Sequence, residues 1–254
     1  MAKYGKTSAG MREQVPWGKH TPVHWRLHHK AIAASKDVNQ ADVLPVLAIK
    51  DPFTWMTSMC RHPYAAEWYH GDDRCPNLVA LTEKELMMAK TQRKHDTNIG
   101  NGKMQRLRDD GTTTIPVSVR YAAGSYTHHE SLVDLWNTYY KNWVTTASSS
   151  PASDSTGGFP HLVIRFEDLI FHTEYVITSI CGCAGGTIKQ GTAFSYVGDS
   201  AKQGQSHEGS SGLFSALSRY GNSTLRIKSF QKEDLKFARK ELDFDLLKYF
   251  HYNG

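Results

Sequence analysis

Lys50 and Ser58 are the residues whose types and spacing most directly suggest chemistry in this chain of 254 residues. Lys50 follows an apolar run at 44–49 and precedes Asp51 and Pro52. This pair is typical of a helix start, because Asp suits the N-cap and Pro suits the first helical position. Ser58 then lies two turns inside the predicted helix. A cation and a hydroxyl beside exposed helical N–H groups can bind an anion such as phosphate. A solvated lysine at an ordinary strand–helix corner is an equally good interpretation of this segment taken alone.

A second apolar run, at 161–166, ends in a similar way on Arg165, with Glu167 and Asp168 close behind it. We interpret these three charged residues as an ion-pair network that stabilises a strand end, not as catalytic groups. We expect the run at 161–166 to lie beside the run at 44–49 in one sheet. Open α/β sheets bind ligands beyond the carboxyl ends of their strands, which is where Lys50 would lie.

The elements that must position these residues alternate between apolar strands and helices. This order predicts an α/β fold of three layers, with a central, mostly parallel sheet flanked by helices. Helices are expected at residues 53–61, 82–94, 173–184 and 232–250, and in an aromatic stretch after Ser131. We interpret the aromatic stripe of that stretch as core, although a sugar-stacking platform has the same spacing. Residues 1–254 are expected to form a single domain, with a flexible surface insertion at 147–158.

Two segments of the sequence resemble one enzyme family. The stretch from 44 to 58 resembles the strand and helix with which sulfotransferases bind the 3′-phosphate of 3′-phosphoadenosine 5′-phosphosulfate (PAPS). That family usually has Arg where this chain has Lys50, and Ser at the position of Ser58. The stretch Val-Ile-Arg-Phe-Glu-Asp-Leu at 163–169 resembles a second strand of the family. The resemblance implies that Lys50 and Ser58 hold the 3′-phosphate of PAPS.

The resemblance also implies a catalytic pair near the N-terminus. Lys19 and His20 resemble a Lys-Thr-His segment in which His takes the proton of the acceptor and Lys lies near the sulfuryl group. In this chain the two residues are adjacent, and neighbours on an extended backbone face opposite ways. His20 is the candidate base, because an ordinary imidazole titrates near neutral pH. A surface cluster of histidines, or an adventitious metal site, is the alternative.

A third contact to the donor is expected from a polar loop that contains Lys202 and Gly204. It resembles the lid loop of glycan sulfotransferases, although an ordinary polar loop fits equally well. Arg226 and Lys228 could contact an anionic substrate, and a solvated basic face is the simpler interpretation of them.

The Gly-rich loop that cradles the 5′-phosphosulfate in that family has only one weak counterpart, Tyr4-Gly5-Lys6-Thr7-Ser8, with no apolar strand before it. We expect the sequence to lack the N-terminal part of the domain. A degenerate loop, or a relative that has lost catalysis, would give the same pattern. A P-loop kinase or NTPase is a further hypothesis, but it needs an upstream glycine and a Mg²⁺ ligand that cannot be assigned.

The composition is that of a globular protein, with 39% hydrophobic residues and a net charge of +5. The sequence contains no run of 18 apolar residues, and we therefore expect no membrane span in this chain. The four cysteines are too few for a disulfide scaffold, and we expect Cys181 and Cys183 to be buried thiols; no metal site is predicted. Asn222 begins the only Asn-X-Ser/Thr sequon. We expect the protein to lie in the Golgi lumen if an N-terminal anchor has been lost, and otherwise in the cytoplasm.

The leading hypothesis is therefore a PAPS-dependent sulfotransferase that acts on a hydroxyl or amine of a glycan or small molecule. PAPS is expected as co-substrate, with no metal. The alternative is a catalytically impaired protein of the same fold that binds an anionic glycan or a nucleotide. Nucleic acid is not an expected partner, because the aromatic residues gather on helical stripes and do not interleave with basic residues on a strand.

Overall fold

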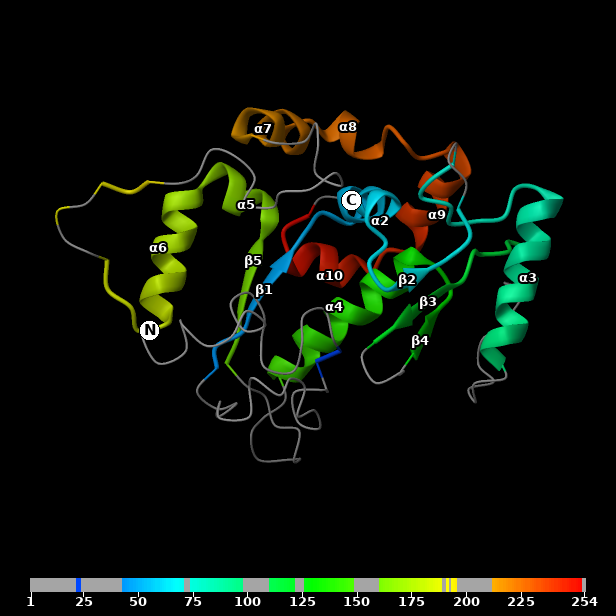
Figure 1. Cartoon of the computed structure of the whole chain (residues 1–254), viewed down its shortest axis with the longest axis horizontal. Helices are drawn as coiled ribbons and strands as arrows, with labels where there is room; N and C mark the ends of the chain where they lie inside the picture. Colours follow the sequence, from blue (N-terminus) through cyan, green and yellow to red (C-terminus); the bar gives the residue numbers. More distant parts are fainter. Residues whose placement is uncertain are drawn as a thin grey trace. The chain divides into compact units, whose positions relative to one another are not determined.

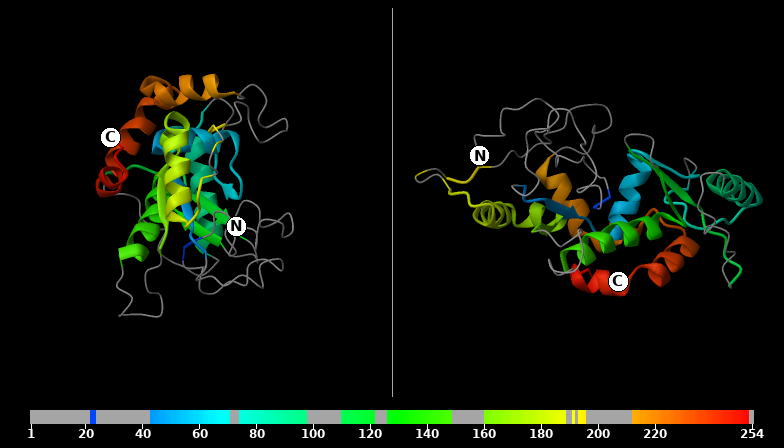
Figure 2. Two further views of the ribbon diagram at one scale, coloured as in Figure 1. Left: turned by 90° about the vertical axis from the view of Figure 1, so that its left-hand side faces the viewer. Right: turned by 90° about the horizontal axis from the view of Figure 1, so that it is seen from below.

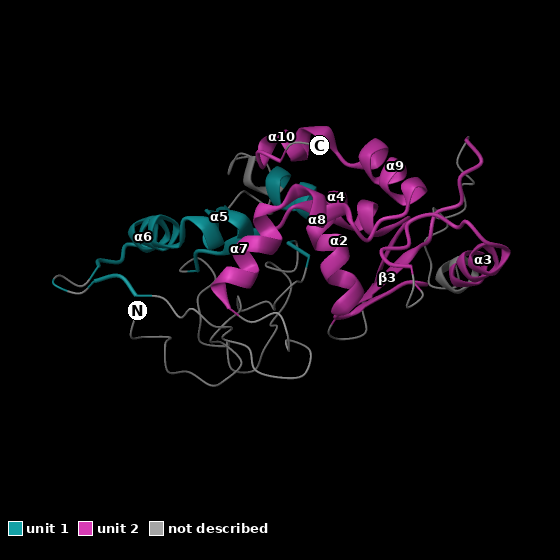
Figure 3. Ribbon diagram, turned by 90° about the horizontal axis from the view of Figure 1, so that it is seen from above, with its two compact units in different colours: residues 1–49, 139–196 teal, residues 50–138, 197–254 magenta. Residues whose placement is uncertain are grey.

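A computed structural model gives the fold of this chain (Figure 1). The structure describes residues 22–23, 43–70, 74–97, 110–121, 126–148, 160–188, 191, 193–195 and 212–252. The chain divides into two compact units: unit 1 comprises residues 1–49 and 139–196, and unit 2 comprises residues 50–138 and 197–254 (Figure 3).

Unit 1 contains a parallel pair of strands. β1 (Val46–Ile49) pairs with β5 (Leu162–Arg165), so that Val46 lies opposite Leu162 and Ile49 opposite Arg165. This confirms that the two apolar runs lie side by side. Ile49 is fully buried and Leu47 nearly so. The carboxyl ends of both strands therefore lie at the same edge of this sheet.

Two helices follow β5 directly, namely α5 (Phe166–Phe171) and α6 (Thr173–Cys183). Arg165 and Asp168 form a bidentate ion pair, with two N···O distances of 2.7 Å, at the junction of β5 and α5. The last turn of α6 corrects the cysteine prediction, because Cys183 is exposed and Cys181 only partly buried. Val176 is the buried residue of α6, and the end of the helix therefore stays in solvent.

Unit 2 contains a three-stranded antiparallel sheet that the sequence did not predict. Its order is β2 (Ala66–Glu67), β3 (Val117–Arg120) and β4 (Tyr126–His129), and α3 (Glu83–Thr97) runs beside it (Figures 1 and 2). Val117 is fully buried in this sheet. Strands of two to four residues carry too little periodicity to be recognised in a sequence.

The aromatic helix is α4 (Leu132–Ser148), which continues from unit 2 into unit 1. Its stripe is core, as predicted, since Trp136 is fully buried and Tyr140 and Trp143 are nearly so. Because α4 extends to Ser148, the expected insertion at 147–158 begins inside a helix, and its remaining residues lie outside the described part of the chain.

The predicted C-terminal helix at 232–250 is two helices, α9 (Lys232–Glu241) and α10 (Phe244–Tyr249). Asn137 holds the break: its Nδ2 donates to the carbonyl of Glu241 at 2.8 Å, and its Oδ1 accepts from the N–H of Asp243 at 3.0 Å. The Asp243 side chain then caps α10. Apolar residues continue at helical spacing through the break. The sequence therefore suggested a single helix.

The remaining helices of unit 2 are α2 (Pro52–Arg61), α7 (Leu213–Gly221) and α8 (Ser223–Ile227). A disulfide joins Cys60, at the end of α2, to Cys75, and the count of four cysteines did not predict it. The α/β class is confirmed. The strands in the described ranges form two small sheets, and the central parallel sheet of a three-layer domain stays a prediction.

Candidate anion-binding site

The start of α2 has the geometry that its sequence predicts. The Asp51 carboxylate accepts from the backbone N–H of Thr54 at 2.9 Å and from the Thr54 hydroxyl at 3.0 Å, and Pro52 occupies the first turn. His62, before Pro63, ends the helix. Asp51 is thus used as a helix cap, and the following turns of α2 pack against α8.

Lys50 and Ser58 come together at this helix. The Lys50 ammonium lies 3.4 Å from the Ser58 hydroxyl and 3.4 Å from the Tyr220 hydroxyl, and 5.4 Å from the centre of the Tyr220 ring. Ser58 donates its own proton to the carbonyl of Thr54 at 2.8 Å. The spacing of eight residues therefore places a cation and a hydroxyl in contact, with a tyrosine of α7 beside them.

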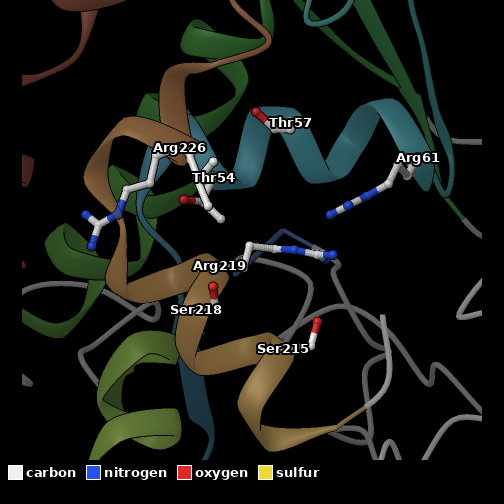
Figure 4. Close-up of a pocket in the computed structure, with 8 residues that line it drawn as sticks. Thr54, Thr57, Arg61, Ser215, Ser218, Arg219 and Arg226 are labelled. Atoms are coloured by element: carbon white, nitrogen blue, oxygen red, sulfur yellow. The ribbon is translucent and has the colours of Figure 1, made fainter. Parts of the chain in front are cut away.

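Unit 2 also contains a cavity of about 380 Å³ at the helices α2, α7 and α8 (Figure 4). Its volume is in the range of small-ligand pockets. Helices α2, α7 and α8 supply its walls, which are rich in basic and hydroxyl side chains. The lining residues are Thr54, Thr57, Arg61, Ser215, Ser218, Arg219, Leu225 and Arg226.

The three arginines of the cavity are not equivalent. Arg226 donates to the Asp51 carboxylate at 3.3 Å and to the carbonyl of Tyr220 at 3.0 Å, so it ties α8 to the cap of α2. Arg61 and Arg219 point toward each other from α2 and α7 (Figure 4). Neither of these two is paired with a carboxylate of the described residues.

This arrangement suits an anion with several oxygen atoms. Two guanidinium groups that share one cavity repel each other, and an anion between them would turn that repulsion into two attractions. The planar fork of Arg matches the oxygen atoms of phosphate and sulfate. The hydroxyls of Ser215 and Ser218 add donors at the same wall. The chemistry of this lining therefore suits a phosphate or sulfate group.

Of the six site residues expected from the sequence, the structure brings Lys50 and Ser58 together. The other four, Lys19, His20, Lys202 and Gly204, lie outside the described residues.

Arg61 and Arg219 were missed by the sequence analysis. Arg61 follows Thr54, Thr57 and Ser58 at helical spacing, so its place on the same face of α2 could have been read from the sequence. Arg219 could not, because its position depends on how α7 packs.

Comparison of the chain with models of protein families, with curated proteins and with solved structures found no match in any of the three. Within the described ranges, no group of three or more His, Cys, Asp and Glu side chains is arranged to hold a metal ion. The same residues include no helix that is both long and apolar enough to cross a membrane. Function therefore has to be inferred from the chemistry of the site itself.

Proposed function

We propose that this protein is a sulfotransferase that takes a sulfuryl group from PAPS and transfers it to a hydroxyl or amine of a glycan or small molecule. The observation that carries the proposal is the contact between the Lys50 ammonium and the Ser58 hydroxyl, 3.4 Å apart at the start of α2. The parallel pairing of β1 with β5 supports it as well, because these strands are the two segments that resemble the family.

In this proposal the 3′-phosphate of the nucleotide binds beside Lys50 and Ser58. The ammonium supplies the charge, and the Ser58 hydroxyl turns its proton from the Thr54 carbonyl to a phosphate oxygen. Tyr220 lies 3.4 Å from the same ammonium and can donate to that phosphate too. Lys replaces the usual Arg, which keeps the charge and loses the bidentate fork. Lys202 and Gly204 complete the donor site.

The transfer step needs a base and a cation at the sulfuryl group. The acceptor oxygen or nitrogen attacks sulfur, the bond from sulfur to the bridging phosphate oxygen breaks, and 3′-phosphoadenosine 5′-phosphate (PAP) leaves. His20 takes the acceptor proton, and Lys19 balances the charge that develops on the transferred group. Positioning and electrostatic stabilisation supply most of the rate, as in phosphoryl transfer.

A protein of this fold that binds an anionic glycan or a nucleotide without catalysis is the second candidate. The observation that favours it is the cavity between α2 and α7, where Arg61 and Arg219 face each other among hydroxyls. None of the residues proposed for catalysis is needed to bind an anion there.

The test is transfer of radioactive sulfate from labelled PAPS to a panel of glycans, phenols and amines. The enzyme proposal predicts a labelled product, and His20→Ala should lower the rate about 10²- to 10⁴-fold. His172→Ala is the matched control. His172 is exposed between α5 and α6, and its replacement should leave the rate unchanged.

PAP binding without transfer to any acceptor would favour the second candidate. Failure to bind PAP would contradict the sulfotransferase proposal.

A further inference from the structure

The single Asn-X-Ser/Thr sequon of the chain lies at an exposed junction between two helices of unit 2. Asn222 ends α7 and caps α8, and residues 221–225 are all exposed. The Asn222 Oδ1 accepts from the N–H of Thr224 at 3.0 Å and from that of Leu225 at 3.4 Å. Its Nδ2 donates to no group of the described residues. The nitrogen to which an N-linked glycan attaches is therefore accessible.

The disulfide between Cys60 and Cys75 is an independent observation about the compartment. The two Cα atoms are 5.8 Å apart, and the bond joins the end of α2 to a loop 15 residues further on. Disulfides form and persist in oxidising compartments and are rare where the thiol pool is reduced. In eukaryotic cells, the lumen in which such bonds form is also the compartment in which N-linked glycans are attached.

We propose that Asn222 carries an N-linked glycan, attached in the oxidising lumen where Cys60 and Cys75 are joined. The glycan comes from an oligosaccharide on a lipid pyrophosphate: the Asn222 Nδ2 attacks the anomeric carbon, the bond from this carbon to the pyrophosphate oxygen breaks, and the amide proton goes to a base of the transferase. The Cys60–Cys75 bond forms when the two thiols give two electrons and two protons to a disulfide of another protein in that lumen, which is reduced to two thiols. The proposal does not depend on the sulfotransferase activity.

The local geometry tolerates this modification. Glycosylation removes one N–H bond of Asn222 and leaves Oδ1, so the cap of α8 is retained. The chain that follows returns to the cavity, since Leu225 and Arg226 line it. A glycan at Asn222 would therefore lie on the segment that leads into the wall of the candidate anion site.

The experiment uses the protein expressed from its own gene in its own cells, with a C-terminal tag. We expect peptide-N-glycosidase to increase its mobility and to convert Asn222 to Asp in heavy-oxygen water, and we expect a peptide map without reductant to show Cys60 linked to Cys75. Thr224→Ala should abolish the modification, and Thr224→Ser, which restores the sequon, should retain it.

An unmodified Asn222 would overturn the proposal, whether or not the cysteines are linked. A glycan that persists in Thr224→Ala would also overturn it, because the modification would then lie elsewhere. Free thiols at both Cys60 and Cys75 would overturn the assignment of the compartment.

Discussion

Arginines serve opposite purposes in two regions of unit 2. Arg74 is enclosed by carboxylates: it contacts Glu85 at 2.6 Å and Asp234 at 3.0 Å, and the Asp234 side chain is fully buried. Arg61 and Arg219 instead share a cavity with hydroxyls, and no carboxylate of the described residues pairs with them. A cation whose partners come from the chain stabilises the fold, whereas cations gathered without such partners are available to a ligand.

Further hydrogen bonds within the chain hold the two carboxylates that pair with Arg74. Asp234 also accepts from the backbone N–H groups of Leu78 and Val79, at 2.9 and 3.1 Å. Glu85 forms a capping box at the start of α3, accepting from the N–H of Thr82 at 3.0 Å while the Thr82 hydroxyl accepts from the N–H of Glu85 at 3.2 Å. The cluster around Arg74 joins α9, α3 and the loop that precedes α3.

The largest expected effect comes from removing the same residue type in each region. Arg74→Ala should lower the free energy of unfolding by about 3–5 kcal/mol, because it leaves buried carboxylates unpaired. Arg219→Ala should change it by no more than about 0.5 kcal/mol, because no carboxylate depends on it. Urea unfolding followed by circular dichroism measures both. Equal losses in the two variants would contradict the distinction.

The disulfide should contribute the next largest effect. Replacing Cys60 and Cys75 together with Ser should cost about 3 kcal/mol, because the unfolded chain regains the freedom of a closed loop of this size. The double replacement of Cys181 and Cys183 with Ser is the control and should have little effect, since Cys183 is exposed and both are free thiols. Unfolding in urea without reductant compares them. No difference between the two double variants would mean that the Cys60–Cys75 bond does not form in solution.

The arginine cavity can be tested by its affinity for a sulfated disaccharide at low salt. Arg61→Ala and Arg219→Ala should each cost about 1.5–3 kcal/mol of binding energy, which is the contribution of a charged hydrogen bond. This corresponds to roughly a ten- to hundredfold weaker Kd. Arg239→Ala, at an exposed position of α9, is the matched control. An equal loss in all three variants would indicate non-specific attraction between the basic protein and its ligand.

A smaller effect should appear in the pH dependence of stability. Burial alone would raise the pKa of Glu85, but hydrogen bonds from Leu81, Arg74 and Thr82 together hold this pKa below its ordinary value of 4.5. The unfolded state therefore binds the proton more readily, and the contribution of Glu85 to stability is present above pH 4.5 and is lost as the pH falls through the lower, folded-state pKa. Glu85→Gln should flatten the acid limb of a plot of unfolding free energy against pH. An unchanged acid limb would contradict this assignment.

Local signals in the sequence predicted one part of the fold well. Asp51, Pro52 and the residue before Pro63 specify the limits of α2 because caps and proline act within a few residues. The pairing of β1 with β5 followed from two similar apolar runs. By contrast, β2 and β3 pair across about fifty residues of chain, and no pattern in either strand specifies that partner.

The parts that were missed depend on tertiary contacts. The break between α9 and α10 is held by Asn137, a residue more than a hundred positions away. The pairing of Cys60 with Cys75 requires the end of α2 to meet the following loop. Arg219 reaches the cavity because α7 packs against α8, which in turn packs against α2. Spacing in the sequence thus predicted the Lys50–Ser58 contact, which is local, but not the cavity.

The most direct test is calorimetric titration of the wild-type protein and Lys50→Ala with two nucleotides, PAP and 5′-AMP, which lacks the 3′-phosphate. If the Lys50 ammonium holds the 3′-phosphate, Lys50→Ala should weaken the binding of PAP at least about tenfold and leave the binding of 5′-AMP unchanged. An equal loss for both nucleotides, or full affinity of Lys50→Ala for PAP, would contradict the account.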